Sequence, residues 1–332
     1  MKTLHLKSPC CQETIQRFGG KRRRCAKCGK TWTIRPRKRG PKPIRRFSNP
    51  VTEILLKGTT LTAWANRRGI TVATASGQFH RHLEKFITTP LNLAMIMPTG
   101  PYILLVDALW FTFKKQDWTM FLLALKPVSE DKAYFLDPVL LAGGESYENW
   151  NAVLLTIPWG LKKQVKAMVS DGFRASRTIT SEQGLVHQRC HFHLIAYLQV
   201  RRGRRKKDIT GKSVREAIYQ NVIKLLEIEN QTDVRKLSAR LKRLAKRSDC
   251  PKSLQMVVAE FLRSLPEFRA YLNYSELHLP TTTGSIETMC KLIRKRVAAV
   301  RTMKALVPWA TALIRLKSPL TCNSKEHNLQ QN

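Results

Sequence analysis

Two carboxylates stand beside apolar runs that are typical of buried strands, where a metal ion could account for them. Asp107 interrupts the run YILLVDALWFTF at 102–113, and Asp171 closely follows the shorter run at 165–169. Short continuous runs rich in Ile, Val, Leu and aromatic residues indicate strands buried on both faces. Burying an unpaired polar group costs about 1–3 kcal/mol by mutational data, and more when the group is charged. We therefore expect a metal ion or a charged partner beside Asp107; the alternative is a carboxylate that caps a turn at a strand end.

Cysteines near the N-terminus have the spacing of a structural zinc site. A closed zinc site takes four soft ligands in a tetrahedron, and a C-x2-C turn supplies two of them. The candidate ligands are Cys10, Cys11, Cys25 and Cys28. Ser8 stands where a CPxC motif would place its first cysteine, which leaves either Cys10 or His5 as the fourth ligand. The sequence predicts one zinc ion; the alternative is a degenerate module that folds poorly or borrows another ligand.

The charge of the chain points to a polyanionic partner. The 332 residues include 59 Lys and Arg against 23 Asp and Glu, a formal net charge of +36 that is spread from end to end. Such an excess favours DNA or RNA as the partner. No apolar run of about 18–20 residues offers a membrane span, and no secretory signal is visible. We expect a cytoplasmic, nucleoid-associated protein without a membrane partner, whose eight cysteines bind metal or are buried thiols.

The segments that must position these residues follow one another along the chain. Residues 1–34 carry the cysteines, and residues 35–50 are a basic linker with Pro and Gly. This linker is either an extended arm for a minor groove or a solvated tether. Residues 51–97 show helical periodicity that Gly69 breaks. A helix, a Gly-containing turn and a second helix predict a helix-turn-helix, with residues 72–87 as its recognition helix.

The rest of the chain predicts an α/β fold with a mixed sheet. The predicted elements, in order, are strands at 102–113, 118–126 and 133–141, a helix at 145–161, a strand at 165–169, a short helix and a strand at 185–188. Pro138 is expected to interrupt the third strand or to leave it at an edge. In this order Asp107 and Asp171 come from neighbouring strands.

Helical spacing dominates the last part of the chain. Residues 98–200 would form the first part of the core, and residues 201–278 an all-helical insertion. Residues 279–317 would complete the core with its final helix. Residues 318–332 are polar and are expected to fray.

The order of elements and motifs resembles the RNase H-like catalytic core of DDE transposases. Residues 279–296, LPTTTGSIETMCKLIRKR, are similar to the TT-N-x-x-E helix start of bacterial insertion-sequence transposases related to the Mutator group. Gly284 stands near the usual position of the Asn. Cys190 and His193 match the C-x-x-H element that follows the second Asp in that group. The resemblance covers the whole chain, including the N-terminal zinc ribbon.

The resemblance implies a transposase that binds transposon ends, cuts DNA strands and joins them to target DNA. Asp107 would bridge two Mg²⁺ or Mn²⁺ ions, Asp171 would bind one of them and Glu287 the other. Two such ions about 3.5–4 Å apart stabilise both the attacking and the leaving oxygen. Cys190 and His193 would support the site, and a homodimer or higher oligomer would assemble on DNA. The alternatives are that Asp171 belongs to a turn and that Glu287 is only the N-terminal charge of its helix.

Two other classes of protein fit parts of the sequence. One is a DNA-binding regulator with an inactive RNase H-like core, and the other is an RNase H-type nuclease without strand transfer. Three carboxylates at the ends of elements disfavour the regulator, and the helical insertion and N-terminal modules disfavour the nuclease. The residues predicted to contact DNA are Arg22, Arg23, Arg24, Arg37, Lys38, Arg39, Gln78, Arg81, Lys85, Lys291, Arg294 and Lys295.

Overall fold

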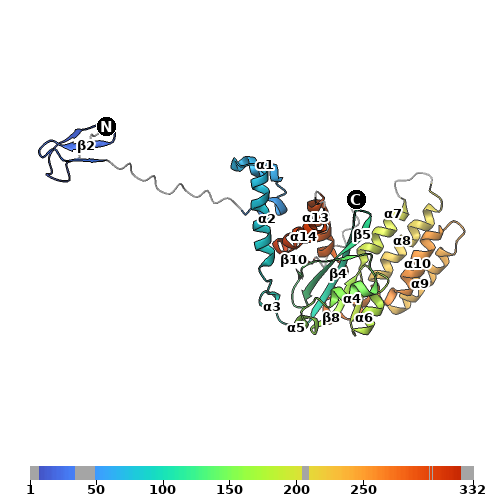
Figure 1. Cartoon of the computed structure of the whole chain (residues 1–332). Coiled ribbons are helices and arrows are strands. Elements are labelled where there is room, and N and C mark those ends of the chain that lie inside the picture. Colours follow the sequence, from blue (N-terminus) through green and yellow to red (C-terminus); the bar gives the residue numbers. More distant parts are fainter. Residues whose placement is uncertain (1–6, 34–48, 204–208, 299, 301, 323–332) are drawn as a thin grey trace. The chain divides into compact units, whose positions relative to one another are not determined.

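The computed structural model divides the chain into two compact units, Met1–Ser48 and Asn49–Asn332 (Figure 1). The structure describes residues 7–33, 49–203, 209–298, 300 and 302–322. Four residues named in the sequence analysis lie outside these ranges: His5, Arg37, Lys38 and Arg39. Each unit is described by itself below.

The N-terminal unit is a small antiparallel sheet. Its strands are β1 (Ile15–Arg17), β2 (Arg22–Cys25) and β3 (Thr31–Thr33), in the order β1-β2-β3. Gly29 has a φ of 73°, and its N–H donates to the carbonyl of Cys25 (3.0 Å) in the turn between β2 and β3. Among the described residues of this unit only Ser8 and Cys25 are buried. So small a core does not stabilise a sheet of this size without a further cross-link, such as a disulfide or a structural metal ion.

The second unit contains a mixed sheet, which confirms the predicted α/β class. Its strands are β4 (Tyr102–Phe113), β5 (Gln116–Pro127), β6 (Lys132–Phe135), β7 (Val139–Ala142), β8 (Val165–Ser170), β9 (Val186–Arg189) and β10 (Leu320–Thr321). The order is β10-β6-β5-β4-β8-β9, and β7 also pairs with β5. Strand β4 is antiparallel to β5 and parallel to β8, and β8 is parallel to β9. The interruption predicted at Pro138 is present, because this residue separates β6 from β7.

Two expectations about this unit were wrong. The single helix expected over 145–161 is divided into α4 (Tyr147–Leu154) and α5 (Trp159–Lys162), with Pro158 just before α5. A proline inside a helix lacks the N–H needed for the i→i−4 hydrogen bond, so α4 ends before it. The expectation that the chain frays from residue 318 onward is also wrong for the first of these residues, since β10 pairs with β6 through Leu320 and Ala133.

The remaining helices cover the sheet and extend from it. They are η1 (Thr52–Leu56), α1 (Leu61–Arg68), α2 (Val72–Thr88), α3 (Leu93–Ile96), α6 (Ser176–Glu182), α7 (His191–Arg202), α8 (Lys212–Glu227), α9 (Gln231–Ala245), α10 (Lys252–Arg263), α11 (Leu265–Phe268), α12 (Ala270–Asn273), η2 (Ser275–Leu277), α13 (Gly284–Val297) and α14 (Met303–Lys317). Among the described residues, no helix combines the length and the apolar character that crossing a membrane requires.

The predicted pair of helices before the core is present and well capped. Thr60 and Thr71 precede α1 and α2, and each side chain accepts a hydrogen bond of 3.1 Å from the N–H three residues on. Such caps satisfy N–H groups that have no partner inside the helix. Gly69 ends α1 with a φ of 65°, a conformation that glycine adopts without steric cost.

Side chains alternate between two hydrophobic clusters along β4, as the period of a strand requires. Ile103 and Leu105 face a cluster that also contains residues of α13 and α14. Leu104 and Val106 face the opposite cluster, which also contains Trp150 of α4. Helix α2 belongs to the first cluster through Phe79, whose ring contacts that of Trp309 at 5.2 Å between centroids. The predicted recognition helix is therefore packed within the unit that carries the sheet.

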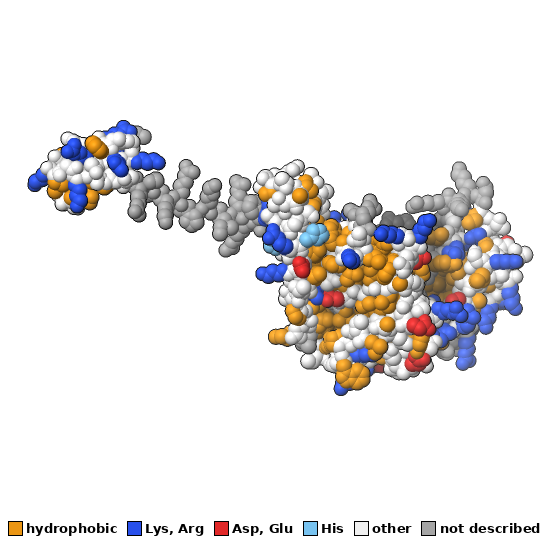
Figure 2. Space-filling view, in the orientation of Figure 1, with side chains coloured by type: hydrophobic (Ala, Val, Ile, Leu, Met, Phe, Trp, Pro, Cys, Tyr) orange, Lys and Arg blue, Asp and Glu red, His pale blue; other side chains and the backbone are white. Residues whose placement is uncertain are grey.

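A third cluster lies among helices α7 to α10. Ile195 and Leu198 of α7 share it with residues of α8, α9 and α10. The helical insertion, expected from residue 201, is thus continuous with α7 (Figure 1). Lys and Arg side chains gather on the outer side of α9 and α10 (Figure 2).

Candidate functional site

The register of the sheet brings Asp107 and Asp171 to neighbouring strands, as predicted. Leu105 of β4 pairs in parallel with Val169 of β8, and the two carboxylates lie two residues further along the chain. Oδ1 of Asp107 accepts the N–H of Ala108 (2.8 Å), and Oδ1 of Asp171 accepts the N–H of Phe173 (3.0 Å). Each of these bonds uses one oxygen of its carboxylate.

Helix α13 brings Glu287 to Asp107. Glu287 lies in the first turn of α13, where its N–H donates to the carbonyl of Thr283 (2.9 Å). One turn later, Sγ of Cys290 lies 3.8 Å from Oδ2 of Asp107, so this face of the helix is packed on β4. Asp107, Glu287 and His193 offer ligand atoms that all lie within 4.8 Å of one another. Two carboxylates and an imidazole so placed could hold a metal ion.

His193 was predicted only to support the site, but in the structure it contacts Glu287 directly. Its Nε2 lies 2.8 Å from Oε1 of Glu287. The signal in the sequence was the C-x-x-H spacing, which places Cys190 before α7 and His193 in its first turn. Sequence alone does not show that the start of α7 meets the start of α13, because that contact joins residues far apart in the chain.

Cys190 is the residue that joins the two helix starts. Its Sγ accepts hydrogen bonds from the N–H of Thr283 (3.3 Å) and from Oγ1 of the same residue (3.4 Å). The N–H of His191 donates to the carbonyl of Thr281 (2.8 Å). These bonds hold the segment before α13 against α7, and they thereby fix where Glu287 enters the cluster.

The charged groups of the cluster shift one another's pKa values. Burial and the charge of Glu287 raise the pKa of Asp107 to about 7. The hydrogen bond from His193 lowers the pKa of Glu287. Burial disfavours the imidazolium, but hydrogen bonds to Cys190 and Glu287 outweigh it and raise the pKa of His193. Without a cation, the cluster therefore keeps a proton on His193 and part of one on Asp107, and a cation bound to Asp107 would displace the proton of that carboxyl group.

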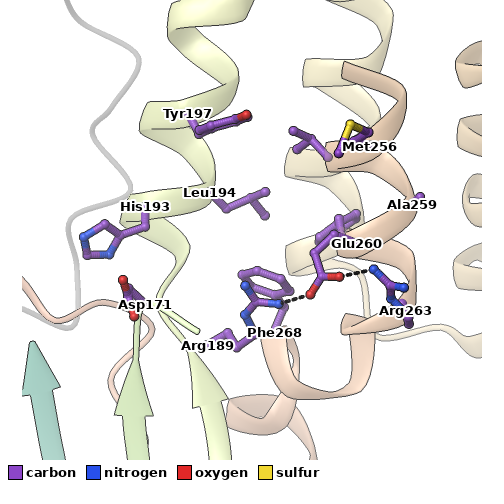
Figure 3. Close-up of a pocket in the computed structure, with 12 residues that line it drawn as sticks. Asp171, Arg189, His193, Leu194, Tyr197, Met256, Ala259, Glu260, Arg263 and Phe268 are labelled. Atoms are coloured by element: carbon purple, nitrogen blue, oxygen red, sulfur yellow. Dashed lines mark hydrogen bonds and ion pairs between the residues drawn. The ribbon is translucent and has the colours of Figure 1, made fainter. Parts of the chain in front are cut away.

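Asp171 faces the same region without joining the tight group. Its charge contributes to the raised pKa of Asp107. Figure 3 shows its carboxylate beside the imidazole of His193, at the edge of a pocket. The structure thus brings the predicted carboxylates into one region, with Asp107 and Glu287 in direct contact range.

A fourth carboxylate, Glu145, was missed by the sequence analysis. Its Oε1 accepts a hydrogen bond from Nε1 of Trp110 (3.1 Å), and Trp110 is largely exposed. Burial and the charge of Asp171 raise the pKa of Glu145. In the sequence Glu145 belongs to the loop GGES before a helix, where an acidic residue is ordinary.

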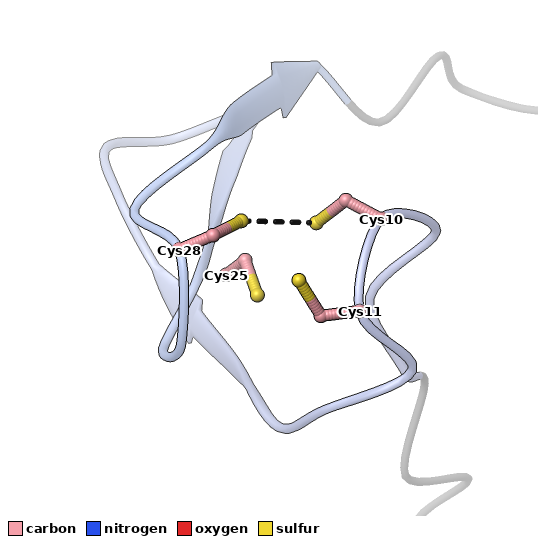
Figure 4. A group of neighbouring side chains, drawn as sticks. All are labelled: Cys10, Cys11, Cys25 and Cys28. Carbon is pink, nitrogen blue, oxygen red and sulfur yellow. Dashed lines mark hydrogen bonds between the residues drawn. The ribbon is translucent and has the colours of Figure 1, made fainter.

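The four predicted cysteines form one cluster in the N-terminal unit (Figure 4). Their sulfur atoms all lie within 4.8 Å of one another, and those of Cys10 and Cys28 are 3.4 Å apart. A tetrahedral zinc ion with bonds of about 2.3 Å needs sulfur atoms about 3.8 Å apart. A contact with Cys28 raises the pKa of Cys11 to about 12, so crowding among the thiols disfavours charge unless a cation is bound. The cluster could hold zinc, and Cys10 is in place as the fourth ligand.

Ser8 has its own role beside the cysteines. It is fully buried, and its Oγ accepts the N–H of Glu13 (3.1 Å) and contacts Sγ of Cys25 (3.3 Å). The hydrogen bond with Ser8 lowers the pKa of Cys25 and so favours its thiolate. The serine that replaces a motif cysteine therefore shapes the loop around the cluster.

The described basic residues predicted to contact DNA lie at the surface, with few exceptions. The exposed ones are Arg22, Arg24, Arg81, Lys85, Lys291, Arg294 and Lys295. Gln78 is half-buried and accepts a hydrogen bond from Arg68 (3.2 Å), and Arg23 is also half-buried. Lys291 lies one turn beyond Glu287, with its Nζ 5.4 Å from the ring centre of Phe192. The positive groups of α13 thus follow the carboxylate cluster along the helix.

Comparison with known proteins assigns no family to this arrangement. No protein-family model matches the chain, and no curated protein matches it either.

Proposed function

We propose that this protein is a DDE transposase, a metal-dependent enzyme that cuts DNA at transposon ends and joins it to a target. The observation that carries the proposal is the meeting of Asp107, from the middle of β4, with Glu287, from the first turn of α13, within 4.8 Å. Asp171 follows the neighbouring strand. Carboxylates brought together from a strand, a strand end and a helix support an RNase H-like catalytic core.

The ligand set suits the proposed ions. Mg²⁺ and Mn²⁺ prefer carboxylate oxygens and retain waters, so Asp107, Asp171 and Glu287 are suitable ligands. Two such ions supply stabilisation of the attacking and leaving oxygens of a phosphodiester. His193 orients Glu287 through their 2.8 Å contact. Cys190, bonded to Thr283, fixes the position of the helix that carries Glu287.

The charge and the smaller elements support DNA as the substrate. The net charge of +36 favours a polyanion. Arg81 and Lys85 lie exposed on α2, in the position of a recognition helix that would read transposon ends. The cysteine cluster is proposed to be a zinc ribbon, and Arg22 and Arg24 beside it are exposed for phosphates. Two or more copies would act together on the DNA.

The test is strand cleavage and joining on DNA that carries the ends of the element, with Mg²⁺ or Mn²⁺. Wild-type protein should cut and join, whereas Asp107→Asn, Asp171→Asn and Glu287→Gln should each lose several orders of magnitude in rate. All three should still bind DNA. The matched control is Glu276→Gln, an exposed residue of η2 that should keep full activity. DNA binding without any metal-dependent cleavage would refute the enzyme and favour a DNA-binding regulator.

A further inference from the structure

A pocket of about 580 Å³ lies directly beside the carboxylate region (Figure 3). Asp171 and His193 form its edge toward the proposed active site. Tyr197 of α7 and Met256 and Ala259 of α10 line it farther out. Its volume lies within the range of about 300–1,000 Å³ that is usual for small-molecule sites.

Three charged groups of this pocket, Arg189, Glu260 and Arg263, are paired with one another. Arg189 donates to Oε1 of Glu260 (2.8 Å), and Arg263 pairs with the other oxygen of the same carboxylate. The guanidinium of Arg189 also lies 4.8 Å from the ring centre of Phe268. The single carboxylate of Glu260 balances only one of the two guanidinium charges, so a positive charge remains at this wall and suits a ligand that carries a phosphate beside an apolar part.

Apolar and flat surfaces fill the rest of the wall. Met256 is 73% exposed and Tyr197 is 42% exposed, although both are large side chains that usually gain by burial. Leu194 and Phe268 lie deeper in the same wall. The site is thus suited to a flat, largely apolar group with a polar edge, for which the Tyr197 hydroxyl is available.

We propose that this pocket takes a single nucleobase, unstacked from the DNA strand that the carboxylates hold. The inference rests on the proposed function, since it requires DNA beside Asp171. The apolar part of DNA is the face of its bases, and within a duplex these faces are stacked on one another. A base can enter the pocket only when it leaves the stack, and this step costs least for a base that is already unpaired.

The test uses two DNA duplexes labelled with 2-aminopurine and the full-length protein in Ca²⁺. One duplex carries the label as an unpaired, bulged base, and the other carries it in a base pair. Stacking of one base on a protein surface is worth about 5- to 150-fold in affinity. The wild-type protein should bind the bulged duplex more tightly by a factor in this range, and the fluorescence of the bulged base should be quenched.

Two substitutions on one helix separate the pocket from a general effect of bulged DNA. Ala259→Phe fills the pocket from an exposed position of α10, and Ser253→Phe adds the same ring at an exposed position that does not line it. The first variant should lose the preference for the bulge and keep its affinity for paired DNA, and the second should retain both. Tyr197→Ala should weaken binding of the bulged duplex alone.

The outcomes distinguish this inference from the proposed function. Equal binding of the two duplexes, or a preference that survives Ala259→Phe, would overturn the nucleobase pocket. Metal-dependent cleavage of paired DNA would then still support the transposase. A protein that binds neither duplex would overturn both proposals.

Discussion

Acid should destabilise the second unit through His187, which is buried beside the candidate site. Its Nε2 lies 2.9 Å from Oγ of Ser170, the residue before Asp171, and its Nδ1 lies 3.5 Å from Oε2 of Glu267. Burial, reinforced by the charges of Arg189 and Arg177, lowers the pKa of His187 to about 4. In the folded protein the imidazole is therefore neutral at any pH above that value.

The sign and the size of the effect follow from this pKa. In the unfolded chain His187 titrates near 6.5, so between pH 6.5 and 4 the unfolded state binds a proton that the folded state does not. The free energy of unfolding should be unaffected above about pH 6.5 and should decrease as the pH falls toward 4. At ~1.36 kcal/mol per pKa unit, the total loss is about 3 kcal/mol.

The assay is urea unfolding of wild type and His187→Asn at several pH values from 4 to 8, at constant salt. Asn can replace the hydrogen bond to Ser170 but does not titrate. The difference between the two proteins in the free energy of unfolding removes the contributions of all other groups. This difference should shift in favour of the variant by about 3 kcal/mol from pH 7 to pH 4. A difference that does not change with pH would refute the neutral, buried histidine.

Three further predictions concern metals and DNA. The full chain should contain one zinc ion. The Cys25→Ser variant should lose this ion and its N-terminal unit should unfold, because structural zinc supplies folding free energy, whereas the control variant Cys250→Ala should keep the ion. Elemental analysis that finds no stoichiometric zinc in the wild type would contradict this prediction. The affinity for DNA should fall by a factor of about 10³–10⁵ between 50 and 200 mM salt if six to ten phosphates are contacted. A plot of the logarithm of the affinity against the logarithm of the salt concentration with a slope shallower than about −3 would argue against phosphate-dominated binding. Because the pKa of Asp107 is raised to about 7, a Mg²⁺ ion must compete with a proton for this carboxylate below that pH. The Mg²⁺ affinity measured by calorimetry should therefore rise by up to about tenfold per pH unit up to pH 7 and then level off. A constant affinity between pH 5.5 and 7 would exclude Asp107 as a proton-linked ligand.

The sheet and its carboxylates were predictable from local patterns. The run around Asp107 reads as a buried strand because its apolar residues are continuous, and β4 is such a strand. Pro138 marked the break between β6 and β7 because proline cannot join a ladder of hydrogen bonds. The cysteine spacing indicated the cluster, since ligands two residues apart lie on one turn.

Such local patterns do not predict contacts between segments that are far apart in the sequence. The approach of His193 to Glu287 depends on the packing of α7 against the start of α13, and no local rule specifies it. Glu145 was missed for the same reason, because its role depends on Trp110 and Asp171 rather than on its own neighbours. The short strand β10 follows a helix and has only two residues, too few for a periodic signal.

The bonds from Cys190 and His191 to the segment before α13 have a consequence for how this protein can change. They close a loop, since Cys190 and Thr283 are 93 residues apart in sequence yet hydrogen-bonded. The helices between them leave the sheet and return to it at nearly one point. Closing a longer loop costs only slightly more entropy, so the part of this segment between α7 and α10 could gain or lose helices while Glu287 stays in register with Asp107. Changes in length there would alter the helical insertion and leave the carboxylate geometry intact.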